Sequence, residues 1–360
     1  MVAVHQFVPV LEPGAIGTHI LAARSVLRGA GFESEIFAGE IHPALAGEEA
    51  FVAPDYGRRV GARSTDLLLY HLAIGNPIAD ELARRREALV VDYHNLTPLR
   101  YFDGWNPVAA WGVAWGRRQL ASLAGRAVLG IGDSHYNEAE LVAAGYARTT
   151  TVPILVPPAW LDVEPDDAVL SRLRTSGAST TWLFVGRLAP NKAQHDIVKA
   201  FAAYRRFHDP GARLLLVGGT SSDAYELALE RFVDRLGLRV AVEITGSVTP
   251  ESLAAHYAAA DVFVVCSEHE GFCVPLLEAW HHELPIVAYD SSAVGETLGG
   301  AGLLLPTKDP LTVAAAVARV MGDDSLRKAL VAAGRARLAE FSLDTTGAAL
   351  VDALRGVAVL

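Results

Sequence analysis

Cysteine is scarce in this chain of 360 residues. The two cysteines, Cys266 and Cys273, have no histidine or cysteine partners at the spacing of a zinc site. Two thiols cannot build a disulfide framework, and we expect both to be reduced, as thiols are in the cytosol. The composition therefore predicts neither a structural disulfide nor a metal site.

Long apolar runs are missing as well. No uncharged apolar stretch reaches the roughly 18–20 residues that cross a membrane. The amino-terminal sequence MVAVHQFVPVLEPG has no basic segment followed by an apolar one. Neither a signal peptide nor a membrane span is expected, and we predict a cytoplasmic protein.

Positive charge is the third shortage. The chain has 31 basic and 41 acidic residues, and both residues 1–160 (13 basic, 16 acidic) and residues 161–360 (18 basic, 25 acidic) are acidic. A nucleic-acid-binding domain is expected to be basic, so this class of partner is excluded. Three small basic groups, at 58–59, 84–86 and 117–118, are typical of a solvated face. Peripheral contact with an anionic acceptor or with the inner face of the membrane is the alternative.

The chain does have a regular alternation of apolar strands and longer amphipathic runs, which indicates βαβ units and parallel sheets. A chain of this length usually exceeds a single core, so two domains are expected. The predicted strands lie near residues 2–8, 34–37, 66–70, 88–91, 127–131, 181–186, 213–218, 240–246, 261–267 and 285–290. The predicted helices lie near residues 17–30, 77–86, 106–124, 137–144, 193–207, 222–236, 250–259, 274–283 and 310–321.

The stretch TVPILVPPAWLDVEPDD (151–167) interrupts this alternation with four of the 18 prolines. We take it as the linker between two doubly wound domains. The prediction is an amino-terminal domain over 1–155 and a carboxyl-terminal domain over 156–342. A last helix over 343–360 is expected to pack back on the amino-terminal domain.

The stretch SEHEGFCVPLLEA (267–279) places acids where a ligand would bind. It follows the buried strand predicted at 261–267, and Pro275 suits the first turn of a helix. Ligands of open α/β sheets bind at this carboxyl edge of the strands. The carboxylates of Glu270 and Glu278 can accept hydrogen bonds from vicinal hydroxyls, as acids do with ribose. In the structural alternative, Glu270 is solvated and Glu278 only favours the helix start.

A second motif adds cations at the same edge. A predicted strand ends at Gly186, and the loop after it carries Arg187 and Lys192 before a helix begins. Arginine can bind phosphate with two parallel hydrogen bonds, and lysine supplies a point charge. Two ordinary surface cations are the alternative. Cations for a diphosphate and acids for hydroxyls together describe a nucleotide-sugar site.

These residues carry a family resemblance. The segment 270–278 resembles the E-x7-E motif of the family-4 retaining glycosyltransferases, and the turn 186–192 looks like the phosphate-binding turn of that family. Residues 232–264 and 283–306 are similar to the surrounding segments of such enzymes. The resemblance implies an α/β fold of the GT-B type, with two Rossmann-like doubly wound parallel-sheet domains facing across a cleft.

The first part of the chain resembles the family more loosely. Gly14 and Gly17 stand where the family has a glycine-rich loop near the donor diphosphate, although the usual adjacent Gly-Gly is absent. VVDYHNLTP (90–98) resembles a His-Asn-x-Thr-Pro segment of members that build bacterial surface polysaccharides, several of them mannosyltransferases. Cys273 stands where a small residue, often glycine, is usual, and Cys266 where proline is frequent.

The resemblance implies roles for the matching residues. Arg187 and Lys192, with Gly186 at the start of their turn, would neutralise the donor diphosphate as the sugar–phosphate bond breaks. Such stabilisation of the leaving group can replace a metal ion. Glu278 would bind the donor ribose.

Further roles concern the transferred sugar. Glu270 would contact its hydroxyls, beside the backbone amides of Gly271 and Phe272. His94 would lie near the reacting carbon, contacting the sugar or orienting the acceptor. His71, at the end of the neighbouring predicted strand, is a weaker candidate for the acceptor site.

We therefore predict a retaining, metal-independent hexosyltransferase that needs no cofactor and uses a nucleotide diphosphate sugar. The segment 90–98 favours GDP-mannose, and UDP-hexoses would suit the remaining motifs. The expected acceptor is a hydroxyl of a glycan, a lipid-linked molecule or a small molecule. A nucleotide-sugar epimerase of the same fold would need an acid/base pair that we cannot assign. A non-catalytic relative would be expected to lack Glu270 or Lys192, and both are present.

Overall fold

The computed structural model describes residues 3–61, 63 and 65–358, which divide into two compact units. Unit 1 contains the chain up to Leu99, then Pro107–Trp160, and the stretch from Phe341 onward. Unit 2 contains Arg100–Asn106 and Leu161–Glu340. The carboxyl-terminal stretch thus groups with the amino-terminal one. The short segment 100–106 joins unit 2, although it lies between two stretches of unit 1 in the sequence.

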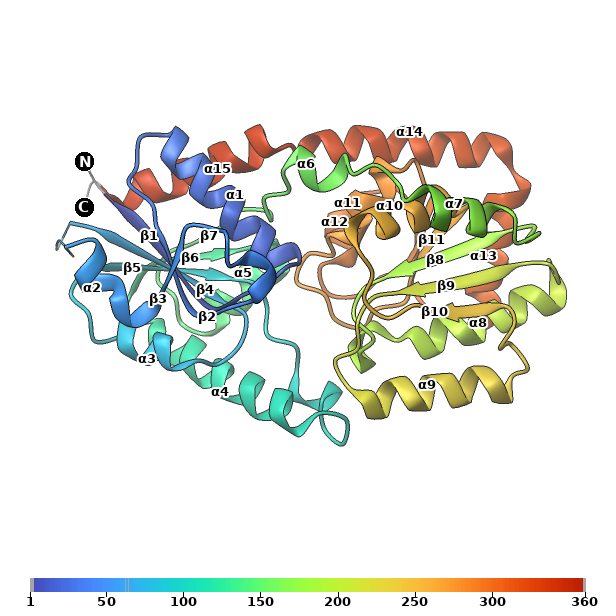
Figure 1. Ribbon diagram of the computed structural model, residues 1–360, viewed down its shortest axis with the longest axis horizontal. Helices are drawn as coiled ribbons and strands as arrows, with labels where there is room; N and C mark the ends of the chain where they lie inside the picture. Colours follow the sequence, from blue (N-terminus) through green and yellow to red (C-terminus); the bar gives the residue numbers. More distant parts are fainter. Residues whose placement is uncertain (1–2, 62, 64, 359–360) are drawn as a thin grey trace. The chain divides into compact units, whose positions relative to one another are not determined.

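Unit 1 is built on a sheet of seven parallel strands in the order β3-β2-β1-β4-β5-β6-β7 (Figure 1). The strands are β1 (Val4–Leu11), β2 (Ile36–Ile41), β3 (Ala50–Val52), β4 (Leu67–Leu72), β5 (Ala88–Tyr93), β6 (Ala127–Gly132) and β7 (Thr149–Thr151). The five predicted strands of this part are confirmed, and residue 2 of the first lies outside the described residues. β3 and β7 were not predicted, because each has three residues and none of them is buried, so no apolar pattern marks them.

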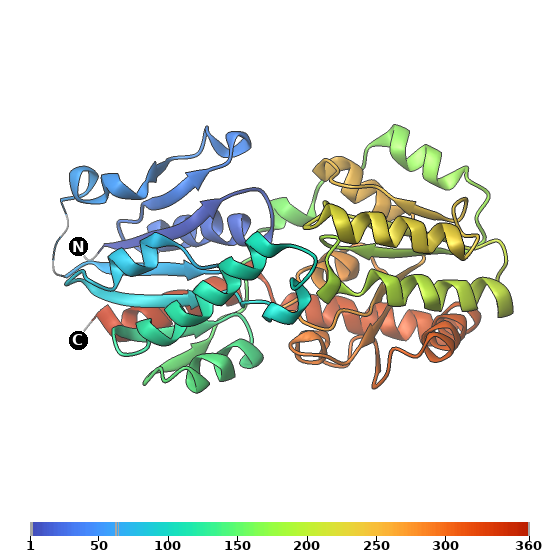
Figure 2. The same cartoon turned by 90° about the horizontal axis from the view of Figure 1, so that it is seen from below.

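Helices cover both faces of this sheet (Figures 1 and 2). They are α1 (Ala15–Gly29), α2 (Tyr56–Arg59), α3 (Pro77–Leu82), α4 (Pro107–Leu123), α5 (His135–Ala143) and α15 (Leu343–Ala358), with 3-10 turns η1 (Pro43–Leu45) and η2 (Ala53–Asp55). α1 and α15 share one apolar cluster with the sheet, and α3, α4 and α5 share the cluster on its other face. In α1 the buried residues Ile20, Ala23 and Leu27 follow the spacing of a helix with one apolar face.

Unit 2 is built on six parallel strands in the order β10-β9-β8-β11-β12-β13. They are β8 (Thr181–Val185), β9 (Arg213–Val217), β10 (Val242–Ile244), β11 (Val262–Val265), β12 (Ile286–Tyr289) and β13 (Leu303–Leu305). β11 is buried along its whole length, as expected for a parallel strand covered on both faces. The five predicted strands are confirmed, and only the three-residue β13 was missed.

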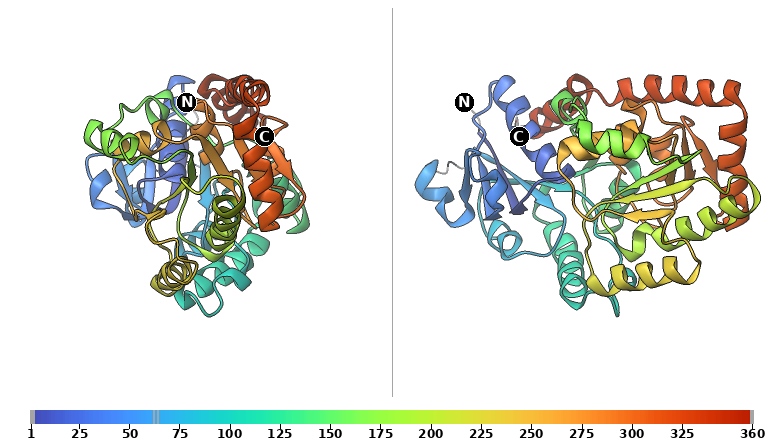
Figure 3. Two further views of the ribbon diagram at one scale, coloured as in Figure 1. Left: turned by 90° about the vertical axis from the view of Figure 1, so that its right-hand side faces the viewer. Right: turned by 45° about the vertical axis from the view of Figure 1, so that its right-hand side comes forward.

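Helices again line both faces of the unit 2 sheet, as the views in Figure 3 show. They are α7 (Asp167–Arg174), α8 (Gln194–Phe207), α9 (Asp223–Arg235), α10 (Pro250–Ala258), α11 (Pro275–His281), α12 (Val294–Leu298), α13 (Pro310–Gly322) and α14 (Asp324–Glu340). The short helix α6 (Pro158–Leu161) spans the change from unit 1 to unit 2 in the sequence. The 3-10 turn η3 (Leu99–Tyr101) begins the segment 100–106, and η4 (Pro190–Lys192) precedes α8. The long helix α14 was not predicted because only Leu330 and Gly334 in it are buried, so it lacks a strong apolar period.

Side-chain caps mark several helix starts. Ser134 accepts a hydrogen bond from the backbone of Asn137 at 3.1 Å before α5, and Asp309 accepts one from Thr312 at 2.9 Å before α13. Such caps satisfy amide groups that have no partner inside the helix. Among the helices that the structure describes, none is both long enough and apolar enough to pass through a membrane.

Gly17 gives a test of how the chain turns from β1 into α1. A Cβ atom on Gly17 would stand 1.9 Å from the carbonyl oxygen of Glu12, whereas one on Gly29, in the same helix, would meet no atom within 4 Å. We expect Gly17→Ala to lower the free energy of unfolding by about 1–3 kcal/mol through overpacking. Gly29→Ala, the matched control, should leave it unchanged or raise it. Urea denaturation followed by circular dichroism measures both variants, and equal midpoints would contradict this packing argument.

Candidate functional site

The candidate site of unit 2 lies where the order of its strands reverses. β8 and β11 are neighbours in the sheet, but β8 leads to β9 on one side and β11 leads to β12 on the other. Loops that leave the carboxyl ends of strands at such a reversal form the ligand crevice of open α/β sheets. Here the loops are residues 186–193 and 266–274, and they carry most of the residues predicted to hold the donor.

The first loop is shaped by two glycines. Gly186 directly follows β8 with φ 153°, and Gly218 directly follows β9 with φ 140°. A Cβ atom on Gly218 would lie 2.3 Å from the carbonyl oxygen of Gly186, so only glycine allows this approach. The carbonyl oxygen of Arg187 then accepts a hydrogen bond from Gln194 Nε2 at 2.8 Å. Backbone packing therefore fixes the path that leads to Lys192.

The two loops meet through a charged pair. Lys192 Nζ lies 2.6 Å from Glu270 Oε2, and the side chains are 23% and 9% exposed. The backbone N–H of Glu270 donates to Ser292 Oγ at 2.7 Å, which ties the second loop to the chain beyond β12. The cation predicted for phosphate and the carboxylate predicted for sugar hydroxyls are thus in direct contact. A ligand that binds Lys192 or Glu270 would have to replace the contact between these two side chains with contacts of its own.

Glu278 is the second acid of the motif and lies in the first turn of α11. Its side chain is buried, and its Oε2 accepts a hydrogen bond from the Tyr257 hydroxyl at 2.6 Å. Burial, together with the charge of Glu278, raises the pKa of Tyr257 well above its ordinary value, so the hydroxyl stays a donor. The carboxylate of Glu278 is therefore held in one orientation, and the sequence analysis did not identify Tyr257 as its partner.

Between the two acids, the loop adopts a strained turn. Cys273 has φ 80°, in the left-handed region that glycine adopts more easily. A small residue, often glycine, is usual at this position in the family that the sequence resembles, and this backbone conformation is the physical reason. Burial raises the pKa of the Cys273 thiol, so this cysteine is not suited to act as a nucleophile. Next to it, the Phe272 carbonyl accepts a hydrogen bond from Thr297 Oγ1 at 2.6 Å, and Gly271 comes just before.

Glu268, the third acid of the stretch 267–279, belongs to a different cluster. It pairs with Lys308, whose Nζ also lies 2.5 Å from Asp196 Oδ2. Although burial acts to raise it, hydrogen bonds from Lys199 and Lys308 hold the pKa of Asp196 below its ordinary value. Lys308 and Asp196 were not predicted as partners of Glu268, because no local motif in the sequence links them to it.

The segment 100–106 also contributes to this end of unit 2. The Trp105 ring packs edge-on against Tyr225, with ring centroids 5.4 Å apart. Tyr101 lies against His269, with centroids 6.3 Å apart, one residue before the acid predicted to hold sugar hydroxyls. The aromatic composition of YFDGW was the available signal, but its packing partners were not predictable from the sequence.

In unit 1, His94 follows β5 directly and its side chain is fully buried. Its Nδ1 lies 3.0 Å from Asp133 Oδ1, and its Nε2 lies 2.9 Å from Nδ1 of His71, which is buried in β4. Both ring nitrogens are therefore engaged inside unit 1. The predicted role of His94 beside a sugar remains a prediction, and contact through the ring would require that one of these partners be displaced.

The glycines predicted near the donor lie at the start of α1. Gly14 is the N-cap residue with φ 138°, and a Cβ atom there would meet nothing within 4 Å. Gly17 faces the Glu12 carbonyl oxygen, so packing alone explains why it is glycine. Ligand contacts of Gly14 and Gly17 remain a prediction.

Within the described residues, one group has the composition of a metal site: His19, His71, Asp92 and His94, with potential ligand atoms within 4.8 Å of one another. Two features do not suit a metal. His19 Nδ1 accepts the backbone N–H of Leu155 at 3.0 Å, so a neutral His19 carries its hydrogen on Nε2 and has no lone pair there. The rings of His71 and His94 are nearly coplanar (8°), with centroids 5.2 Å and nitrogens 2.9 Å apart. Their facing nitrogens lie along one line and do not converge on a third point, which favours a shared proton.

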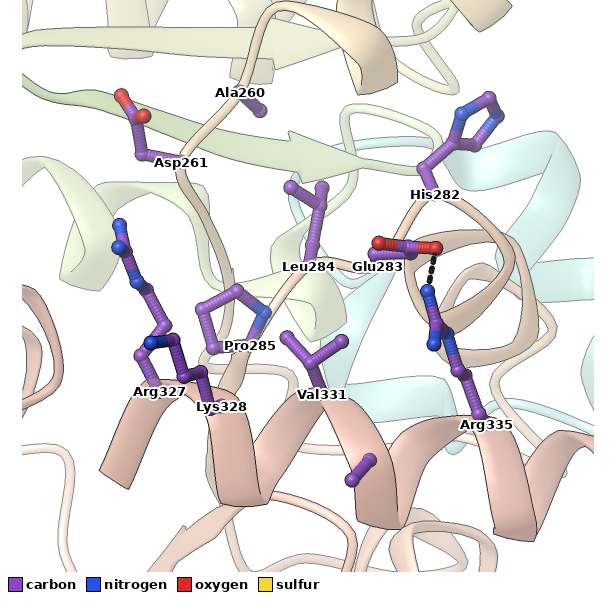
Figure 4. Close-up of a pocket in the computed structure, with 11 residues that line it drawn as sticks. Ala260, Asp261, His282, Glu283, Leu284, Pro285, Arg327, Lys328, Val331 and Arg335 are labelled. Carbon is purple, nitrogen blue, oxygen red and sulfur yellow. Dashed lines mark hydrogen bonds and ion pairs between the residues drawn. The ribbon is translucent and has the colours of Figure 1, made fainter. Parts of the chain in front are cut away.

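A surface pocket of about 440 Å³ lies at the other edge of the unit 2 sheet (Figure 4). Asp261 and Pro285 line it, each directly before the first residue of β11 or β12. Arg335 and Glu283 form an ion pair in its wall (Figure 4). Because the pocket lies at the amino ends of the strands, it is separate from the loops at the strand reversal and is not the candidate donor site.

Comparison with known proteins finds relatives of the part of the chain that contains these loops. Residues 179–323 match the family described as glycosyl transferases group 1. The chain is 35% identical over 205 residues to the GDP-mannose-dependent alpha-(1-6)-phosphatidylinositol monomannoside mannosyltransferase of Mycobacterium tuberculosis, covering 53% of this chain and 52% of the relative. It is 30% identical over 256 residues to the D-inositol 3-phosphate glycosyltransferase of Kineococcus radiotolerans, covering 67% of this chain and 59% of the relative. The alignments thus span a little more than half the length of these relatives.

The fold has close structural counterparts. The sucrose-phosphate synthase of Thermosynechococcus elongatus superposes with a TM-score of 0.78 at 20% identity, over 99% of both chains. The chain therefore has the GT-B fold, with two Rossmann-like domains, and residues 179–323 are similar to the group 1 glycosyl transferases. The fold and the relationship to glycosyltransferases that the sequence predicted are confirmed.

The hydrogen bond between Tyr257 and Glu278 can be tested by removing one atom. Tyr257→Phe deprives a buried carboxylate of a donor, and we expect the free energy of unfolding to fall by about 1–3 kcal/mol. Tyr204→Phe is the matched control, since that hydroxyl makes only a long contact of 3.4 Å with Thr180. Urea denaturation compares the two, and an equal loss in both variants would show that the Tyr257 hydroxyl has no special partner.

Proposed function

We propose that this protein is a glycosyltransferase that moves a hexose from a nucleotide diphosphate sugar to an acceptor hydroxyl. The observation that carries the proposal is the 2.6 Å contact between Lys192 Nζ and Glu270 Oε2 at the reversal of the sheet. A phosphate-binding cation and a hydroxyl-binding acid are thereby placed side by side, with the oriented Glu278 on the following helix. The names of both relatives, a mannosyltransferase and a glycosyltransferase, support the same activity.

The cations would stabilise the leaving group. When the bond between sugar and diphosphate breaks, the diphosphate gains negative charge, and fixed positive charge lowers the energy of that state. Arg187 can bind phosphate oxygens with two hydrogen bonds, and Lys192 can add a point charge once the donor replaces its contact with Glu270. These side chains would do the work that a metal ion does in other transferases. The proposal therefore includes metal independence and no cofactor.

The acids would hold the donor by its hydroxyls. The Glu278 carboxylate, held by Tyr257, would accept hydrogen bonds from the ribose diol. Glu270, released from Lys192, would accept hydrogen bonds from the transferred sugar. The amides of Gly271 and Phe272 lie in the same loop and would contact the sugar or its phosphate. Positioning of this kind supplies much of the rate enhancement in group transfer.

GDP-mannose is the donor that we propose. The Mycobacterium tuberculosis relative is GDP-mannose-dependent by name, and it aligns with more than half of this chain. The segment 90–98, with its His-Asn-x-Thr-Pro pattern, independently resembles mannosyltransferases. A UDP-hexose is the alternative donor, since the cations and acids described above bind parts that all nucleotide sugars share.

The acceptor and the stereochemistry complete the proposal. The E-x7-E pattern over 270–278 supports retention of the anomeric configuration. Both relatives are named for inositol-containing acceptors, one a lipid and one a small phosphate. We propose a hydroxyl of a glycan, of a lipid-linked molecule or of a small polyol as the acceptor. The reaction would take place in the cytoplasm, with peripheral contact at the membrane when the acceptor is a lipid.

A nucleotide-binding panel tests the donor site first. GDP, UDP, ADP, TDP and their common sugars would be titrated by calorimetry without metal. We expect GDP and GDP-mannose to bind most tightly, and Lys192→Ala to weaken binding by about 10–100-fold, the effect of one charge-assisted hydrogen bond. Lys328→Ala, in the pocket at the opposite sheet edge, is the matched control and should bind as the native protein does. If no nucleotide binds, or both variants behave alike, the proposed donor site is wrong.

Transfer itself needs a separate assay. The purified protein would be incubated with GDP-mannose and polyol, glycan or lipid-linked acceptors, with and without EDTA. Release of GDP that EDTA does not change, and an α-linked product by NMR, are expected, since α-linked donor sugars keep their configuration under retention. Loss of activity in EDTA would refute metal independence, and a β-linked product would refute retention.

A further inference from the structure

Five ionisable side chains meet at the carboxyl end of β5 in unit 1. They are His19 from α1, His71 from β4, Asp92 from β5, His94 just after β5 and Asp133 just after β6. Their side chains are at most 1% exposed. An unpaired charge at such a site costs several kcal/mol. Each hydrogen in this cluster should therefore have a definite position.

The contacts set the order of these hydrogens. Gln6 Oε1 lies 2.9 Å from His71 Nε2 and can only accept, so Nε2 of His71 carries the hydrogen. A neutral His71 then has its lone pair on Nδ1, which lies 2.9 Å from His94 Nε2 and 3.3 Å from Asp92 Oδ2. The Asp92 carboxylate carries no hydrogen, so His94 must donate the bond to His71. His94 Nδ1 must also donate, because its partner is the Asp133 carboxylate at 3.0 and 3.1 Å. A histidine that donates from both nitrogens is an imidazolium.

The surrounding charges support this assignment. Asp133 lies on one side of His94, and Asp92 Oδ2 lies 3.8 Å from His94 Nε2 on the other. Although burial acts to lower it, these two carboxylates raise the pKa of His94 to about 9. Burial lowers the pKa of His71 to about 4, so that ring stays neutral. His19, whose Nε2 donates to Asp92 at 3.0 Å, completes the cluster.

The proton between His94 and Asp133 can be carried by either side chain. Burial raises the pKa of the Asp133 carboxyl, while the charge of His94 lowers it. We assign the proton to His94 because Asp92 attracts it from the other side of the ring. The charge of His94 and a hydrogen bond from His19 hold the pKa of Asp92 well below its ordinary value, against the effect of burial. Asp92 is therefore a carboxylate that favours a cation beside it.

We propose that His94 is a fixed buried cation clamped between Asp133 and His71, and that these two are positioning residues for the turn after β5. That turn begins at Asn95, which has φ 74° in the left-handed region. The Asn95 side chain donates to Asn137 Oδ1 at 2.7 Å. We call the two contacts of His94, with Asp133 and with His71, the clamp. The clamp holds His94, which directly precedes this strained turn, so removal of the clamp would loosen the turn itself.

This inference deepens the proposed function, and only its catalytic part rests on that function. A histidine that donates from both nitrogens has no lone pair, so it cannot accept a proton from an acceptor hydroxyl. His94 would then serve the transferase through its charge and the position of its backbone. The rate of transfer should show no ionisation near pH 6.5, where an ordinary histidine titrates.

The clamp also has a consequence for stability. The pKa of His94 in the folded protein, about 9, lies above the value of about 6.5 for an unfolded histidine. The stabilisation is therefore fully present below about pH 6.5 and is lost as the pH rises through about 9. Asp133, Asp92, His71 and His19 are the titratable groups that face His94 and share in this dependence.

The test is long-range ¹H–¹⁵N NMR on protein labelled at its 12 histidines. His94→Gln identifies the His94 signals. We expect both His94 nitrogens to be protonated at pH 7.5 and to lose one proton in a single step near pH 9, with His71 neutral and its hydrogen on Nε2. A neutral His94 at pH 7.5 overturns the proposal. A His71 hydrogen on Nδ1, as the opposite amide orientation of Gln6 would require, overturns it too, as does displacement of these protons by added Zn²⁺.

Two variants distinguish the loss of the clamp from a nonspecific effect of removing a carboxylate. Asp133→Asn keeps the shape of the side chain and removes its charge, and we expect the pKa of His94 to fall by about 1–3 units. Asp162→Asn is the matched control, since Asp162 faces the partly exposed His281 at 3.5 Å in unit 2 and should leave His94 unchanged. If Asp133→Asn does not fold, His71→Gln provides the second test and should also lower that pKa. An unshifted His94 in the folded variant refutes the clamp.

The two proposals can fail separately. The NMR experiment needs no substrate, so a protonated His94 in a protein that binds no nucleotide would refute the transferase and keep the clamp. Sugar transfer by a protein whose His94 is neutral would refute the clamp and keep the transferase. If both proposals hold, Asp133→Asn should lower kcat more than it changes KM. A new ionisation below pH 8 should then appear in the pH profile of kcat.

Discussion

The candidate site depends on one constraint: β8 and β11 must be neighbours in a parallel sheet. Parallel strands cannot be joined by a tight turn, so each neighbour follows a crossover, usually with a helix. The two loops that leave β8 and β11 therefore come from distant parts of the chain, and Lys192 and Glu270, 78 residues apart, meet at one edge. The glycine contact between Gly186 and Gly218 and the bond from Tyr257 to Glu278 refine this geometry, but they follow from the order of the strands.

The two units treat buried charge differently. In unit 2 the pair of Lys192 and Glu270 is partly exposed, so either partner can be released to a ligand at moderate cost. In unit 1 the side chain of His94 is fully buried between Asp133 and His71. Displacing Asp133 would remove the opposite charge beside His94, and displacing His71 would leave the Nε2 hydrogen of His94 without its acceptor. The first arrangement suits a binding site in which the ion pair separates when a ligand binds and forms again when the ligand leaves. The second suits a fixed support for the turn at Asn95, which an incoming ligand does not change.

Much of the fold was predictable because its signals are local. Strands with buried apolar residues and helices with an apolar face show in the sequence, and all ten predicted strands are present. The three-residue strands β3, β7 and β13 contain no buried residue, and α14 buries too few residues to show a pattern. In the site, glycine after a strand, proline at a helix start and acids in between marked the loops correctly. Glu268 resembled its neighbours in the sequence, yet the structure pairs it with Lys308.

By itself, the sequence determined the alternation of strands and helices, the ends at which charged residues stand, and the residue types suited to a nucleotide sugar. Only the tertiary structure decided which of these residues touch. His19, His71, Asp92, His94 and Asp133 come from α1 and from the ends of three neighbouring strands, and no spacing in the sequence marks them as one cluster. Hydrogen bonds and buried ion pairs act over a few ångströms, whereas the order of strands that brings their partners together is a property of the whole sheet.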